Sequence, residues 1–174
     1  DVASAPADQR EKRRGVAGNF FIFKIAGAAA DRMWSLDDCV RAATRANRRT
    51  YTMGVALSPC SMPHTLRHNF EIGADEMEIG MGIHGEPGIA REPMKPADAV
   101  ADEIMERILA EMEPAAGDRV AVLVNSLGAT PQMELYVVNR RVHEHLARRN
   151  VEVHRTWVGP YCTSMEMAGL SVTL

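Results

Sequence analysis

The sequence lacks most features of secreted and membrane-bound proteins. Its three cysteines, Cys39, Cys60 and Cys162, include no CxxC pair, and an odd number of thiols suits a reducing cytoplasm better than a disulfide framework. The longest apolar stretch, around residues 16–30, is interrupted by polar residues and is too short to span a bilayer. No signal-peptide pattern precedes it. We therefore expect a cytoplasmic protein with no membrane partner.

The sequence also has little excess charge of either sign and few aromatic residues. The net charge is only -3 and the charges are mixed along the chain, so nothing indicates a nucleic-acid partner. Aromatic residues make up 5% of the chain, whereas methionine occurs 11 times, which predicts a core packed largely with thioethers. With 174 residues and 46% hydrophobic content, the chain is long enough for one globular domain.

The hydrophobic pattern alternates between helical and strand periods. We expect residues 1–14, which are polar and carry a basic cluster, to form a linker or arm, and residues 15–174 to form one α/β unit with helices layered on a mixed sheet. Helices are predicted over 16–33, 35–48, 96–112 and 131–149, and strands over 50–57, 77–83, 119–124, 151–158 and 165–174. The helix over 16–33 is apolar almost all round, which predicts burial on every side.

One predicted strand carries the main candidate for chemistry. The apolar residues at 77, 79, 81 and 83 alternate with Glu78, Gly80, Gly82 and His84. The two glycines leave that second face bare, as expected where a ligand lies against the backbone. The turn at residues 85–88 would place His84 at the mouth of the strand, within reach of a ligand. The competing interpretation is an ordinary histidine bonded to a carbonyl group.

The spacing of potential ligands argues against two possible zinc sites. His64 and His68 would share one face of a helix, but their loop lacks helical periodicity and a third ligand. The pair His84-x-Glu86 begins a zinc deaminase signature, but the Pro-Cys-x-x-Cys part is missing, since residues 160–164 offer only one thiol. We expect no metal site in this chain.

A second candidate binding loop covers residues 125–131, Asn-Ser-Leu-Gly-Ala-Thr-Pro, between a buried strand and a helix. A small-residue loop that leads into a helix N-terminus can receive an anion or a polar ligand. It is not a Walker loop, because the GxxxxGK[ST] lysine is absent. The alternative is that Thr130 simply caps the helix.

Several segments, taken in order, resemble the ketose-binding domain of the dihydroxyacetone (glycerone) kinases. The histidine segment, residues 76–88 (Glu-Met-Glu-Ile-Gly-Met-Gly-Ile-His-Gly-Glu-Pro-Gly), closely resembles the substrate-histidine motif of that family. The other segments that carry the resemblance are 14–18, 24–30, 52–60, 125–131 with 133–136, and 163–174. The resemblance implies that this chain is the second of two α/β subdomains in the ketose-binding unit.

The resemblance also implies a role for the histidine. In that family a histidine nitrogen holds the ketone carbon of dihydroxyacetone as a hemiaminal while a phosphoryl group is transferred to the terminal hydroxyl. By motif position this catalytic and substrate-binding residue is His84, and Gly80 and Gly82 leave room for the small substrate. A neutral imidazole adds to a ketone and has nothing to add to in glycerol, so the bond would select ketoses over polyols.

The remaining parts of a kinase are expected elsewhere. The family's acid and base residues and its glycine-rich loop belong to the first subdomain, and ATP with Mg²⁺, or a phosphoprotein donor, to another domain or subunit. The chain starts at Asp1 without methionine and stops at Leu174 within an apolar run, so we expect a fragment or a processed product. We also expect a homodimer. Two alternatives remain open: a kinase for a four-carbon ketose such as erythrulose, and a non-catalytic ketose-binding, regulatory or structural module.

Overall fold

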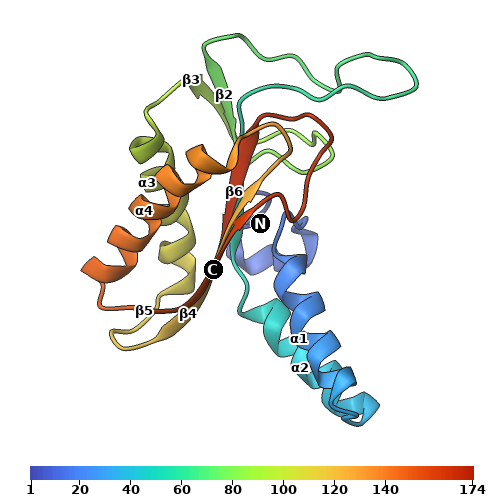
Figure 1. The fold of residues 1–174 in the computed structure, drawn as a ribbon, viewed down its shortest axis with the longest axis vertical. Coiled ribbons are helices and arrows are strands. Elements are labelled where there is room, and N and C mark those ends of the chain that lie inside the picture. The colour runs from blue at the N-terminus through green and yellow to red at the C-terminus, as the bar shows by residue number, and fades with distance from the viewer.

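The computed structural model describes residues 1–174 as a six-stranded sheet with helices on both sides (Figure 1). The strand order is β3-β2-β1-β6-β4-β5. Strands β4 and β5 pair in parallel, and every other neighbouring pair is antiparallel. The strands are β1 (Thr52–Ala56), β2 (Glu76–Ile79), β3 (Ala90–Pro93), β4 (Arg119–Ser126), β5 (Glu152–Gly159) and β6 (Gly169–Thr173). The predicted α/β class with a mixed sheet is confirmed.

Helices α3 (Ala97–Met112) and α4 (Gln132–Arg148) cover one face of the sheet, as the sequence predicts. The apolar stripe of α3, which includes Val100, Ile104 and Ile108, is buried against the strands. The two helices are also joined by polar contacts, because Asp102 of α3 accepts two hydrogen bonds from the Arg141 guanidinium and one from His145. This layer and the facing strands form the main core.

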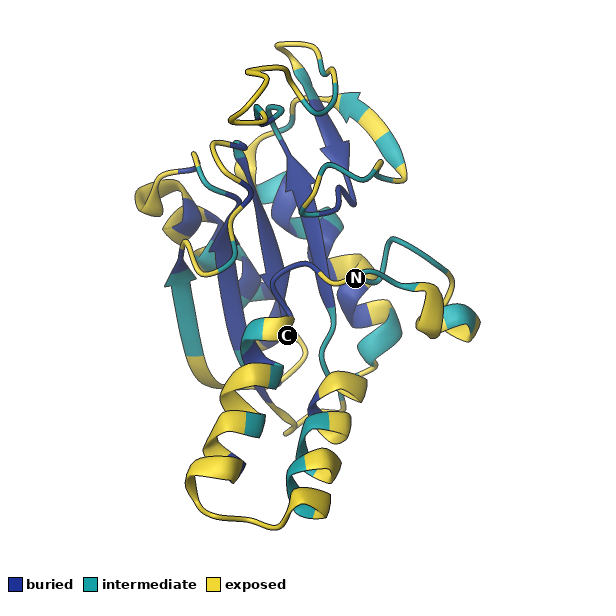
Figure 2. Ribbon diagram, turned by 90° about the vertical axis from the view of Figure 1, so that its right-hand side faces the viewer, coloured by how far each residue is buried: buried dark blue, intermediate teal, exposed yellow.

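Helices α1 (Asn19–Asp31) and α2 (Leu36–Arg48) form a hairpin that projects beyond the sheet (Figure 1). The prediction of a helix buried on every side over 16–33 is wrong: only Phe21 and Ala29 of α1 are buried, and Phe23 is 70% exposed. The reason is that α2 covers one side of α1 and nothing in the chain covers the other, as Figure 2 shows. No helix in the structure combines the length and apolar character needed to cross a membrane.

Strand β2 is shorter than the alternating pattern predicts. It ends at Ile79, and Gly80 then adopts a left-handed conformation with φ of +75° that takes the chain out of the strand. The apolar alternation continues because Met81 is buried in a separate cluster, with Cys60, Leu127 and others, beneath the loops at this end of the sheet. The chain returns as the edge strand β3, which the sequence pattern does not reveal.

The segment predicted as a linker or arm lies against the domain. It contains a short 3-10 helix, η1 (Ala7–Lys12), and the Val2 amide donates to the Thr52 carbonyl at 2.9 Å. Arg13 is almost fully buried and pairs through two nitrogens with the Glu111 carboxylate of α3, at 2.6 and 2.7 Å. Arg14, the next residue, reaches the loop that carries His84.

Candidate functional site

The histidine loop, defined as residues 80–88, connects β2 to β3 and is closed by its own backbone. The Gly82 amide donates to the Glu86 carbonyl and the Gly85 amide to the Gly82 carbonyl, both at 3.0 Å. At its far end, the Gly88 amide donates at 3.0 Å to the carboxylate of Glu78, a buried residue of β2 that also pairs with Arg91. The loop therefore has a defined shape although it lies outside the sheet.

Two side chains from distant parts of the sequence also support the loop. The Arg14 guanidinium donates to the Gly80 carbonyl at 2.6 Å and to the Pro87 carbonyl at 3.0 Å, so one side chain joins both ends of the loop. The Asn69 side-chain amide donates to the carbonyl of His84 at 3.4 Å. The sequence does not predict these supporting roles, because its only signal is the basic cluster over residues 12–14.

His84 lies at the tip of this loop with its side chain 83% exposed. Its Nδ1 atom is 3.1 Å from Oε1 of Glu86, and its backbone amide donates to Oε2 of the same carboxylate at 3.0 Å. Partial burial alone would raise the pKa of Glu86, but hydrogen bonds from backbone amides and from His84 outweigh it and lower that pKa. Glu86 is therefore an anion beside the imidazole, while Nε2 has no protein partner.

The two glycines of the predicted binding face are both close to other protein atoms. A Cβ added at Gly80 would lie 2.7 Å from the Ala3 side chain. One added at Gly82 would lie 2.2 Å from Oε2 of Glu86 and 2.6 Å from Nε of Arg14. The close packing alone thus explains why both positions are glycine. Their role in substrate binding stays a prediction.

The loop over 125–131 lies at the same end of the sheet as the histidine loop, and its polar groups bond within the protein. The fully buried Asn125 side chain accepts from the backbone amides of Tyr161 and Cys162. The Thr130 hydroxyl accepts from the Gly169 amide at 2.8 Å, and α4 has no side-chain cap, so the prediction that Thr130 caps the helix is wrong. These bonds hold β4, β6 and the loop at 160–168 together.

The structure brings no metal ligands together. No group of three or more His, Cys, Asp or Glu side chains is placed to hold a metal ion. His64 and His68 lie in an irregular loop closed by a bridge between Ser61 and His68, so they do not share the face of a helix.

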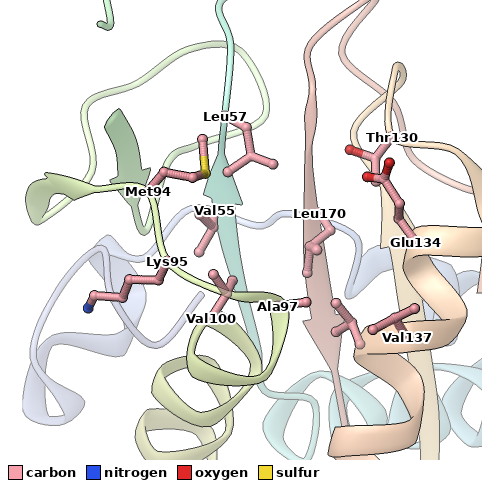
Figure 3. Close-up of a pocket in the computed structure, with 11 residues that line it drawn as sticks. Val55, Leu57, Met94, Lys95, Ala97, Val100, Thr130, Glu134, Val137 and Leu170 are labelled. Atoms are coloured by element: carbon pink, nitrogen blue, oxygen red, sulfur yellow. The ribbon is translucent and has the colours of Figure 1, made fainter. Parts of the chain in front are cut away.

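A separate apolar cavity of about 250 Å³ lies on the helical side of the sheet, between α3 and α4 (Figure 3). Its wall includes Val55, Leu170 and Val137, and eight of its eleven lining residues are hydrophobic. The ammonium group of Lys95 points away from it and pairs with Glu92 and Glu103. The cavity is lined by neither His84 nor the two glycines of the histidine loop, and Thr130 is its one residue from the loop over 125–131, so the histidine loop remains the candidate site.

The fold and the loop define an α/β domain that presents a histidine, in contact with a carboxylate, at one end of its sheet. The whole chain, residues 1–174, matches the Dak1 domain, and the chain belongs to this family. It is 49% identical over 168 residues to a PTS-dependent dihydroxyacetone kinase 2, dihydroxyacetone-binding subunit DhaK, of Listeria innocua, covering 97% of this chain and 51% of the relative. The predicted family is confirmed.

Two further relatives differ in what their names describe. An L-erythrulose kinase of Pectobacterium atrosepticum is 41% identical over 178 residues, covering 100% of this chain and 30% of the relative. A solved structure described as a dihydroxyacetone kinase operon co-activator superposes with a TM-score of 0.87 at 36% identity, covering 93% of this chain and 50% of that one. The chain spans about half the length of the dihydroxyacetone-binding subunits that it matches.

Proposed function

We propose that this chain is the part of a dihydroxyacetone kinase that holds the ketose, and that His84 forms a hemiaminal with the ketone carbon. The observation that carries the proposal is the exposed His84 side chain, whose Nδ1 lies 3.1 Å from Glu86 and whose Nε2 has no protein partner. The covalent bond would fix the substrate so that its terminal hydroxyl meets the phosphoryl donor, which lowers the entropic part of the barrier.

The donor in this proposal is a separate domain or subunit. The Listeria relative is named as PTS-dependent, which supports a phosphoprotein donor. ATP with Mg²⁺ is the alternative donor. The erythrulose kinase relative supports a four-carbon ketose as an alternative substrate, because the exposed loop sets no tight limit on the far end of the ligand.

A non-catalytic ketose sensor is the second candidate. It is favoured by the similarity to the operon co-activator structure, which covers nearly all of this chain. Both functions use the same histidine, so ketose binding does not separate them. Phosphorylation of dihydroxyacetone by the full-length parent protein, supplied with a donor, would separate them.

The proposal is tested by native mass spectrometry of the chain with dihydroxyacetone. The wild-type protein should gain the mass of one dihydroxyacetone, since addition to a ketone loses no atom, and should gain nothing from glycerol. His84→Ala should show no adduct, whereas His64→Ala, which removes an exposed loop histidine elsewhere, should behave as wild type. Equal adduct formation by His84→Ala and wild type would refute the assignment.

A further inference from the structure

Nothing in the proposed reaction explains why His84 is accompanied by a carboxylate. Glu86 lies two residues further along and bonds both the ring and the backbone of His84, through Oε1 and Oε2 respectively. A side chain that only stabilised the turn would need only the backbone contact. The second contact, to the ring, therefore needs an explanation of its own.

A carboxylate is acceptor-only, so the contact to Nδ1 requires the proton to be on Nδ1. In a neutral imidazole this leaves the lone pair on Nε2, the atom without a protein partner. We infer that Glu86 is a positioning residue for ketose addition: it fixes the tautomer and orientation of His84 so that Nε2 attacks, and it stabilises the positive charge that the ring gains. This inference rests on the proposed function of His84.

Glu86 has a definite role in the addition of Nε2 to the ketone. The Nε2 lone pair forms the bond to the ketone carbon, and the π pair of the carbonyl moves to its oxygen. The ring becomes a cation and the oxygen an alkoxide. The alkoxide takes up one proton from the solvent and the ring keeps its Nδ1 proton, so the adduct is a hemiaminal with an imidazolium ring. Glu86 accepts the hydrogen bond of that Nδ1 proton, so its negative charge opposes the ring charge in the adduct.

The surrounding residues keep the carboxylate in place. The amides that bond Glu86 belong to the loop itself, and the Arg14 guanidinium joins the two ends of the loop beside it. Gly82 has no side chain, which leaves the space that Oε2 of Glu86 and Nε of Arg14 occupy. The pair is thus built into the loop and does not depend on a chance contact at the surface.

The experiment compares wild type with Glu86→Gln, and with Glu71→Gln as a control that removes an exposed charge from a neighbouring loop without touching His84. Nitrogen-15 NMR of the labelled histidine rings reports the tautomer without any ketose. We expect Nδ1–H in wild type and Glu71→Gln, and a shift towards Nε2–H in Glu86→Gln, whose amide group can donate to Nδ1. Unchanged amide signals from β2 would show that the variant folds.

The same samples are then titrated with dihydroxyacetone. We expect the adduct equilibrium constant of Glu86→Gln to fall about tenfold, the size of one charge-assisted hydrogen bond. The same tautomer in wild type and Glu86→Gln would overturn the inference, as would an unchanged adduct constant. If wild type forms no adduct while the tautomer still follows Glu86, then the covalent step of the proposed function fails and the positioning role stands.

Discussion

At the residue scale, three side chains meet at one short loop. In the proposed reaction His84 supplies the nucleophile and Glu86 orients it, and in the structure Arg14 closes the loop through two carbonyls. The sequence identifies the histidine because its motif is distinctive. It does not identify Arg14, which lies 66 residues before the first carbonyl that it bonds. Local sequence patterns contain no information about such a contact.

Gly82 offers a direct test of this arrangement. The methyl group of Gly82→Ala would lie 2.2 Å from Oε2 of Glu86, so the carboxylate must move away from His84. We expect the dihydroxyacetone adduct constant to fall about tenfold, the equivalent of one lost charge-assisted hydrogen bond. Titration followed by native mass spectrometry measures it.

The control for this substitution is Gly27→Ala in α1, where an added Cβ meets nothing within 4 Å. Alanine favours a helix over glycine, so this variant should be more stable by about 0.5–1 kcal/mol with normal ketose binding. An unchanged adduct constant in Gly82→Ala would show that Glu86 does not need its present position.

At the scale of elements, periodicity predicts helices and most strands well, but it does not show what covers them. Helices α2, α3 and α4 and strands β1, β4 and β5 lie where the patterns place them, within about two residues. Apolar character all round α1 wrongly predicts burial, because its outer face has no covering element within this chain. The alternation over 77–83 predicts a longer β2 than the structure has, because Met81 is buried by loops instead of by the sheet.

The polar contacts between α3 and α4 carry a prediction about pH. The Arg141 guanidinium, aided by His145, holds the pKa of Asp102 well below its usual range, against a smaller opposing effect of burial. A lowered pKa in the folded state stabilises the fold above the ordinary carboxylate pKa, near pH 4, and that stability is lost as the pH falls further. Asp102→Asn should therefore cost about 1 kcal/mol at neutral pH and little in acid.

Denaturant unfolding at several pH values measures this effect. Asp98→Asn is the matched control, because Asp98 pairs with Arg140 at the exposed surface of the same two helices and should contribute little. Equal losses for both variants, or a loss for Asp102→Asn that does not shrink as the pH falls below about 4, would contradict the role given to the contacts of Asp102.

At the scale of the whole molecule, the histidine loop, the loop over 125–131 and the loop at 160–168 gather at one end of the sheet. The α1–α2 hairpin projects from the other end. The resemblance of the sequence to the kinase family assigns acid and base residues to another subdomain and the donor to another unit. In the proposed function, the chain by itself would hold the ketose, and the groups that move the phosphoryl group would lie in other parts of the kinase.

We therefore expect the purified chain to transfer no phosphoryl group to dihydroxyacetone, either from ATP with Mg²⁺ or from a phosphoprotein donor. A coupled assay for dihydroxyacetone phosphate measures this, with the Listeria innocua relative and its donor as the positive control. Product formed by the purified chain alone would mean that the acid and base groups lie within residues 1–174.

The most direct test of the central claim is NMR of the chain with nitrogen-15 in its histidines and dihydroxyacetone labelled with carbon-13 at the ketone carbon. A covalent bond from Nε2 predicts a one-bond coupling between that carbon and Nε2 in wild type and its absence in His84→Ala. Ketose bound by wild type without this coupling, or the same coupling in His84→Ala, would contradict a covalent bond to His84.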